Sequence, residues 1–172
     1  RTTTTVPDEA TASGVDPARA QALVETLAAD DLEGRDNQSP GSDASQAYLV
    51  DQLAEFTEPI DGDTLDGYGH TFDVGTNLLG VIPGGELADE YVVIGAHYDH
   101  LGSDCITDTP GDAICNGAAD NAAGVATVLE VGRSLAGGEE PPRRSIIVAL
   151  WDAEEDGLLG AEAYVADPVV PL

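Results

Sequence analysis

The sequence predicts an α/β sandwich in which at least part of the central sheet is parallel. Two continuous apolar runs, residues 91–96 and 145–151, are typical of strands that are buried on both faces of a sheet. Between these runs, residues 121–136 carry apolar side chains at helical spacing. Buried strands that alternate with helices indicate crossover connections, which pair strands in parallel.

The N-terminal part of the chain predicts two helices. Its first residues are polar and aperiodic, and we expect residues 1–15 to be a leader or linker. An Asp-Pro pair at 16–17 supplies an N-cap and a proline at the first helical position, so a helix is expected over residues 17–29. A Ser-Pro-Gly-Ser segment at 39–42 then breaks the chain, and the apolar spacing beyond it predicts a helix from 44 to about 56.

The next segments complete the alternation of strands and helices. Residues 58–70 are rich in Asp and Gly and are expected to form a loop. A strand is predicted over residues 76–82, because this apolar segment ends at a Pro-Gly-Gly turn. After the strand over residues 145–151, a last helix is predicted from 157 to 165.

The composition excludes several classes of function. The chain has 172 residues, with 33 Asp and Glu against 6 Lys and Arg, and its formal net charge is −27. A generic nucleic-acid-binding domain is excluded because it needs clustered cations, and docking on an anionic membrane is disfavoured. No apolar run approaches the ~20 residues of a membrane-spanning helix. The acid excess instead resembles that of proteins adapted to high salt.

The chain contains two cysteines, Cys105 and Cys115, with a Pro-Gly turn signal between them. An even count, close spacing and the lack of a spare thiol favour one local disulfide in an exported protein. The alternative is a pair of reduced thiols in a cytosolic loop. The chain also starts at Arg1 and contains no Met, so we expect a processed product or a fragment.

Chemically active side chains gather where the predicted buried strands end. The first strand runs into His97, Asp99 and His100, the second runs into residues 152–156, and Asp120 opens the helix between them. In open α/β sheets, ligands bind at the carboxyl ends of the strands, so these three junctions are expected to converge on one edge.

Each of these residues also has a purely structural explanation. Asp120 is placed as a helix N-cap, a single His at a strand end is often structural, and the Glu154–Glu155 pair stands in a chain rich in solvated acids. Their joint placement nevertheless predicts a metal site. Imidazole and carboxylates form a nitrogen and oxygen ligand set that suits zinc, with manganese or cobalt as alternatives.

Four segments taken together carry a family resemblance. They read LAADDLEGRDNQSPGSDASQAYLVDQLAEF, VVIGAHYDHLGS, NGAADNAAGVATVLEVGRSL and RRSIIVALWDAEEDGLLGAEAYV. In this order they resemble the M28 family of co-catalytic zinc peptidases, which includes secreted bacterial aminopeptidases. The resemblance implies a three-layer α/β/α sandwich with a mixed, largely parallel central sheet. Residues 16–172 would be the N-terminal part of one catalytic domain, without an inserted protease-associated domain.

The resemblance also implies a role for each residue at the strand ends. His97, Asp120 and Glu155 match metal ligands, and Asp120 matches the residue that bridges two zinc ions. Glu154 matches the general base that activates the water at the metals. Asp99 matches the aspartate that orients the zinc-binding histidine, a role that also makes independent physical sense.

The chain departs from the family pattern beyond the Glu pair. Family members complete the site with a further carboxylate and a further histidine, and no His follows His100 before the chain ends at Leu172. We therefore expect a missing C-terminal part of the same domain, an incomplete sheet, and an inactive fragment.

The function expected for the complete protein is that of a secreted or periplasmic aminopeptidase that acts on peptides with two zinc ions. One alternative is a glutaminyl-cyclase-like enzyme of the same fold that uses one zinc. The other is a non-catalytic interaction domain of receptor type.

Overall fold

The computed structural model describes residues 14–60, 65–103, 105 and 111–171, so residues 1–13 of the predicted leader or linker lie outside the described residues. The elements in chain order are α1 (Pro17–Leu27), η1 (Asp30–Arg35), α2 (Pro40–Ala54), β1 (Glu58–Pro59), η2 (Leu65–Gly67), β2 (Gly69–Phe72), β3 (Gly75–Ile82), β4 (Leu87–His97), η3 (Ala118–Ala122), α3 (Ala123–Ala136), β5 (Arg144–Trp151) and α4 (Leu159–Ala166).

The described strands form one mixed sheet in the order β1-β3-β5-β4, with β2 also paired to β3. Strands β4 and β5 are parallel, and the α3 crossover joins them. The other pairings are antiparallel, as expected for β2 and β3, whose short connection can only join antiparallel strands. The sheet is mixed, as predicted, and its parallel share among the described strands is smaller than predicted.

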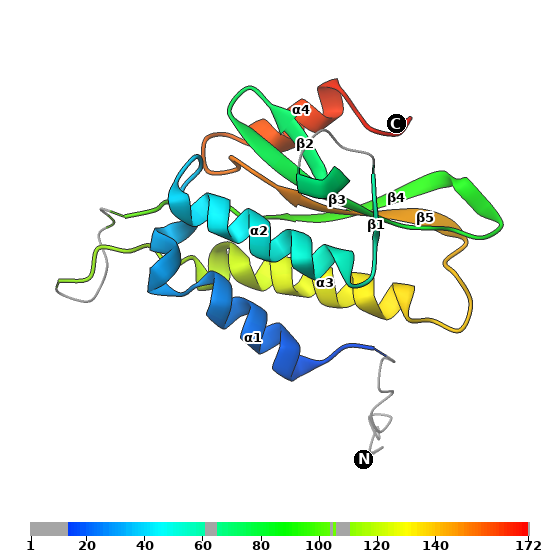
Figure 1. The fold of residues 1–172 in the computed structure, drawn as a ribbon, viewed down its shortest axis with the longest axis horizontal. Helices are drawn as coiled ribbons and strands as arrows, with labels where there is room; N and C mark the ends of the chain where they lie inside the picture. The colour runs from blue at the N-terminus through cyan, green and yellow to red at the C-terminus, as the bar shows by residue number, and fades with distance from the viewer. Residues whose placement is uncertain (1–13, 61–64, 104, 106–110, 172) are drawn as a thin grey trace, which may run out of the picture.

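Helices cover both faces of the sheet, which makes three layers (Figure 1). Along β5, Ile146, Val148 and Leu150 belong to the core under α1, α2 and α3, whereas Ile147 and Ala149 belong to a smaller core with α4. Successive side chains of a strand point to opposite faces, so this alternation explains why the run at 145–151 is apolar throughout. The predicted sandwich is confirmed.

Three segments differ from the sequence predictions. The expected loop at 58–70 contains β1 and the start of β2, because two-residue strands and glycine-containing strands carry little side-chain signal. The second helix begins at Pro40 rather than at residue 44, because Ser39 caps it by accepting a hydrogen bond from the Ser42 backbone N–H at 3.1 Å. The third predicted helix becomes regular only at Ala123, after η3.

Strand β4 is less buried than its apolar run predicts. Its side chains Tyr91, Val92 and Val93 are 36%, 44% and 39% exposed. The reason is that β4 forms one edge of the sheet built by the described residues. The prediction that this run is buried on both faces is therefore wrong for the described chain.

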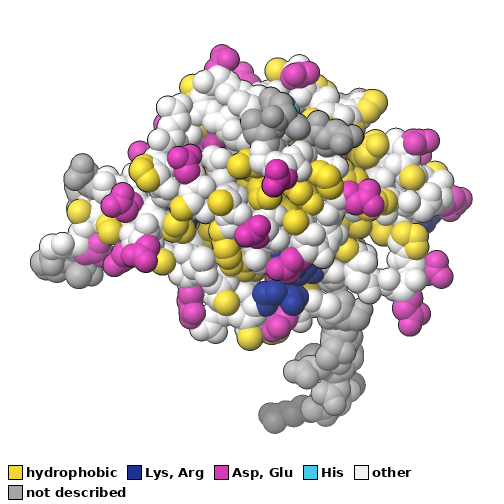
Figure 2. Space-filling model, viewed as in Figure 1, with side chains coloured by type: hydrophobic (Ala, Val, Ile, Leu, Met, Phe, Trp, Pro, Cys, Tyr) yellow, Lys and Arg dark blue, Asp and Glu magenta, His cyan; other side chains and the backbone are white. Residues whose placement is uncertain are grey.

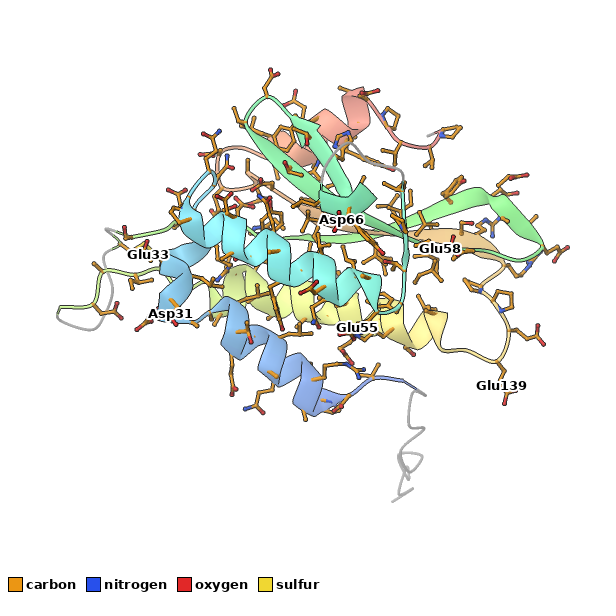
Figure 3. The ribbon with its side chains drawn as sticks, in the orientation of Figure 1. Asp31, Glu33, Glu55, Glu58, Asp66 and Glu139 are labelled. Atoms are coloured by element: carbon orange, nitrogen blue, oxygen red, sulfur yellow. A yellow bond between two sulfur atoms is a disulfide. The ribbon has the colours of Figure 1, made fainter. Side chains whose placement is uncertain are left out.

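Acidic side chains are scattered over the face that Figure 2 shows, and they far outnumber the basic side chains there. Among the described helices, none combines the length and the apolar content that crossing a membrane requires. Figure 3 labels six exposed acids that come from well-separated parts of the chain: Asp31, Glu33, Glu55, Glu58, Asp66 and Glu139.

Candidate metal centre

The strand ends meet as the sequence predicts. His97 at the end of β4 lies in parallel register with Trp151 at the end of β5, and the Tyr98 backbone N–H donates to the Trp151 carbonyl at 2.9 Å. The loops that follow both strands therefore leave the sheet at the same edge. Asp120 lies in η3, between the β4 loop and α3.

His97, Asp120 and Glu155 bring three potential ligand atoms together. One nitrogen or carboxylate oxygen from each residue lies within 4.8 Å of the other two. His97 Nε2 is 3.1 Å from Asp120 Oδ1. The His97 ring is largely buried, whereas the Asp120 side chain is 67% exposed, so the cluster opens to solvent on the Asp120 side.

Asp99, in the loop after β4, contacts both His97 and the loop after β5. It is buried, and its Oδ2 accepts a hydrogen bond from the Glu155 backbone N–H at 3.1 Å. His97 Nδ1 lies 3.2 Å from the Asp99 carbonyl oxygen and 3.6 Å from Asp99 Oδ1, which is buried and has no hydrogen-bond partner among the described residues. In the tautomer with its proton on Nδ1, the His97 ring keeps a free lone pair on Nε2, on the side of Asp120. A metal ligand requires this tautomer.

The charge environment of His97 is strongly negative. Burial by itself lowers the pKa of His97, but hydrogen bonding to Asp99 and the negative charges of Asp99 and Glu154 outweigh burial and raise the pKa above 6.5. The same groups that favour a proton on the ring favour a bound cation beside it.

Glu154 stands next to this cluster and remains accessible. Its Oε2 is 3.8 Å from His97 Nε2, and its side chain is 34% exposed. The preceding residue, Ala153, is fully buried and has a φ of 52°, so the backbone leaves the extended conformation of β5 directly before the two Glu residues. A carboxylate in this position can exchange a proton with a water molecule at the cluster.

His100 contributes a contact that the sequence analysis did not assign. Its Nδ1 lies 2.6 Å from Glu155 Oε1, and both side chains are mostly buried. The pair holds the Glu155 carboxylate at the cluster. A second His within three residues of His97 was the signal that could have indicated this role.

Two further buried polar residues support the β5 end. Asn77 Oδ1 accepts from the Asp152 backbone N–H at 3.0 Å, and its Nδ2 donates to the Gly160 carbonyl at 2.8 Å. Asp152, the first acid after β5, is fully buried and accepts from the backbone N–H groups of Thr76 and Ala153 at 2.9 and 3.0 Å. Burial raises the pKa of Asp152, although these hydrogen bonds oppose that effect. An Asn within an apolar strand was the available signal for Asn77.

The predicted disulfide between Cys105 and Cys115 is present, with Cα atoms 5.7 Å apart. It closes the segment between β4 and η3, and the Cys115 backbone N–H donates to the Gly102 carbonyl at 2.9 Å. The bond therefore restrains the connection between the loop after His97 and the segment that carries Asp120.

Two cavities of the described surface lie away from the ligand cluster. One, of about 560 Å³, is lined by residues of β2, the turn after it and α4, including His70, Phe72 and Leu159. A smaller one of about 260 Å³ adjoins it and reaches Asp152. The ligand cluster itself sits on an open edge, so its assignment depends on side-chain chemistry and not on concavity.

Two relatives and one solved structure illustrate what the chain is similar to. It is 36% identical over 96 residues to aminopeptidase NAALADL1 of Rattus norvegicus, covering 54% of this chain and 11% of that protein. It is 40% identical over 87 residues to a probable zinc metalloprotease of Pyrenophora tritici-repentis, covering 51% of this chain and 19% of that protein. A Zn-dependent exopeptidase of Parabacteroides distasonis superposes with a TM-score of 0.68 at 20% identity, covering 93% of this chain and 59% of that one, and this likeness shows the fold.

The sequence profile of peptidase family M28 matches residues 77–171, a range that begins in β3 and contains every side chain of the cluster. This chain is therefore a member of peptidase family M28.

Proposed function

We propose that His97, Asp120 and Glu155 bind zinc in the complete protein. The observation that carries the proposal is the convergence of one imidazole nitrogen and two carboxylate oxygens within 4.8 Å. Zinc accepts this ligand set, and the orphaned Oδ1 of buried Asp99 behind His97 matches the usual support of a zinc-binding imidazole. Two relatives are named as a probable zinc metalloprotease and a Zn-dependent exopeptidase, which favours this metal.

The proposed site holds two ions once the protein is complete. Asp120 offers two oxygens and is the most exposed of the three ligands, so it can face one ion together with His97 and another together with Glu155. Each ion would then have two ligands from the described residues, and catalytic zinc normally takes three from the protein. A further carboxylate and a further His from outside this chain would complete the set.

The reaction proposed for the complete protein is hydrolysis of an N-terminal peptide bond. Bound zinc supplies Lewis acidity, which polarises the scissile carbonyl and makes water acidic enough to lose a proton at neutral pH. Glu154 accepts that proton as the water oxygen adds to the carbonyl carbon, and it delivers the proton to the amide nitrogen, after which the C–N bond breaks and the amine leaves. Asp99 holds His97 in the ligating tautomer, and His100 holds Glu155 in place.

The chain covers only part of the length of the proteins that it is similar to. It spans 11% of the rat aminopeptidase and 59% of the Parabacteroides distasonis exopeptidase. We therefore assign the activity to the complete protein and expect the 172-residue chain alone to be inactive. The disulfide favours an exported protein, because such bonds persist in oxidising compartments.

The decisive experiment is the Glu154→Gln variant of the complete protein, assayed on an aminoacyl arylamide. Activity should fall by about 100-fold or more, because general acid–base catalysis contributes on this scale, while the zinc content stays at the wild-type value. Glu139→Gln, on an exposed turn, is the matched control and should keep full activity. Full activity in Glu154→Gln would refute the role of Glu154. Cyclisation of an N-terminal Gln without arylamide cleavage would refute the peptidase assignment.

A further inference from the structure

Arg35 is a fully buried base in an acidic chain. It is one of six Arg and Lys residues, and its side chain is among the largest that are completely inaccessible to solvent. Burial lowers the pKa of Arg35, and the charge of Asp99 opposes this effect. Burying a guanidinium is costly unless its donors are bound, so its partners indicate what the residue is there to hold.

The partners of Arg35 are backbone carbonyl groups on two loops. Nε donates to the Tyr98 carbonyl at 2.9 Å, in the loop that carries His97 and Asp99. Nη1 donates to the Asn116 carbonyl at 2.7 Å, and Nη2 donates to the Gly117 carbonyl at 3.1 Å. Both carbonyls lie directly before the segment that carries Asp120. Nη1 also donates to a carbonyl at the end of α1.

The backbone around Arg35 also bonds to the same loops. The Arg35 carbonyl accepts from the His100 N–H, and the Gly34 carbonyl accepts from the Gly102 N–H, both at 3.2 Å. A Cβ on Gly34 would lie 2.6 Å from the Cys115 carbonyl, so the turn must have glycine there. A Cβ on Gly117 would lie 2.5 Å from Nη2 of the guanidinium.

We propose that Arg35 is a positioning residue for the metal centre. Its planar guanidinium sets the separation between the His97 loop and the Asp120 segment, and thereby holds Nε2 of His97 opposite Oδ1 of Asp120. A lysine carries the same charge but presents its donors from a single point, so it cannot reach carbonyls on both loops with the same geometry. The proposal deepens the zinc site proposed above and rests on it for the identity of the ligands.

The first test measures zinc affinity of the complete protein by competition with a chelator. Arg35→Gln and Arg35→Lys should bind zinc about 10–100-fold more weakly, the loss typical when a group that supports a metal ligand is removed. The cobalt-substituted variants should also show altered visible absorption, because that spectrum reports ligand geometry. Arg19→Gln is the matched control: Arg19 is paired with buried Glu130 at 2.6 Å and joins α1 to α3, and its hydrogen bonds go to Glu130 and Gly14 rather than to the loops of the cluster. It should keep wild-type affinity and spectrum.

The second test follows hydrogen exchange of the metal-free protein. In both Arg35 variants, amides in residues 98–102 and in 115–121 should exchange at least about tenfold faster, while the strands keep their protection. Arg19→Gln should leave these two segments unchanged. Unchanged exchange in Arg35→Lys, or an equal loss of zinc affinity in Arg19→Gln, would overturn the positioning role.

The two proposals can fail separately. If the wild type binds no zinc but both loops still loosen in the Arg35 variants, the metal assignment fails and the positioning of the loops stands. If the wild type binds zinc and the Arg35→Lys variant binds it equally well with the same cobalt spectrum, the metal assignment stands and the role of Arg35 is wrong. If Arg35→Gln does not fold, Arg35→Lys, which keeps the charge, decides the outcome.

Discussion

The Glu155 backbone N–H donates a hydrogen bond to Oδ2 of Asp99 at 3.1 Å, across the two loops that leave the parallel strands β4 and β5. The same carboxylate faces Nδ1 of His97. Asp99 thus fixes a backbone group next to one proposed ligand and the ring of another.

This double contact predicts the effect of Asp99→Asn in the complete protein. The amide keeps the shape of the side chain but has no charge to favour the proton on His97 Nδ1. We expect zinc affinity to fall about 10–100-fold, with little change in the melting temperature of the metal-free protein. Equilibrium zinc titration checks this, with Asp156→Asn, an exposed acid in the loop after β5, as the control. Equal affinity in the Asp99 variant and the wild type would contradict the assignment.

Replacing Asn77 by Ala should cost fold stability. Its side chain is fully buried and binds the Asp152 N–H and the Gly160 carbonyl, so the variant leaves both backbone groups without these partners. The free energy of unfolding should fall by about 1–3 kcal/mol. Urea unfolding measures it, and Gln21→Ala on the exposed face of α1 should change it by less than about 0.5 kcal/mol.

The pair between Glu130 and Arg19 predicts part of the acid sensitivity of the fold. Burial would raise the pKa of Glu130, but the hydrogen bond and charge of Arg19 outweigh it, and the pKa lies below 4.5. A carboxyl with a lowered folded-state pKa stabilises the fold above its unfolded-state pKa. That contribution disappears as the pH falls from about 4.5 through the folded-state value.

Glu130→Gln should therefore be less stable than the wild type at pH 7, and the difference should shrink as the pH is lowered below 4.5. Thermal unfolding from pH 7 to pH 3 provides the measurement. The exposed Glu139→Gln is the control, and its difference from the wild type should not follow this course. If the difference in stability between Glu130→Gln and the wild type widened on acidification, the pKa of Glu130 would be raised by folding and not lowered.

The net charge of −27 predicts a salt response. Exposed acids from well-separated segments, such as Glu33, Glu58 and Glu139 in Figure 3, repel one another and are screened at high ionic strength. The melting temperature of the apo protein should rise between low and molar sodium chloride. A melting temperature that stays constant or falls would count against adaptation to salt.

The sequence predicted the location of the cluster because the rule that locates it depends on strand order alone. His97 and Glu155 follow two apolar runs joined by one helix, and parallel neighbours must end at the same edge. Arg35 and Asn77 could not be predicted in the same way. Their partners are backbone groups up to 82 and 83 residues away, and no local pattern encodes such contacts. The β1 strand was missed because it consists of two residues.

The exposed edge at Tyr91, Val92 and Val93 affects how the chain can be handled in solution. An edge strand with apolar side chains is a template for strand addition by a second copy, and mutual repulsion between highly charged copies opposes that encounter. Screening weakens this repulsion at the same time as it relieves repulsion within each copy. The salt concentration that best stabilises the fold therefore also lowers the barrier to aggregation, and the two effects set an upper limit on useful ionic strength.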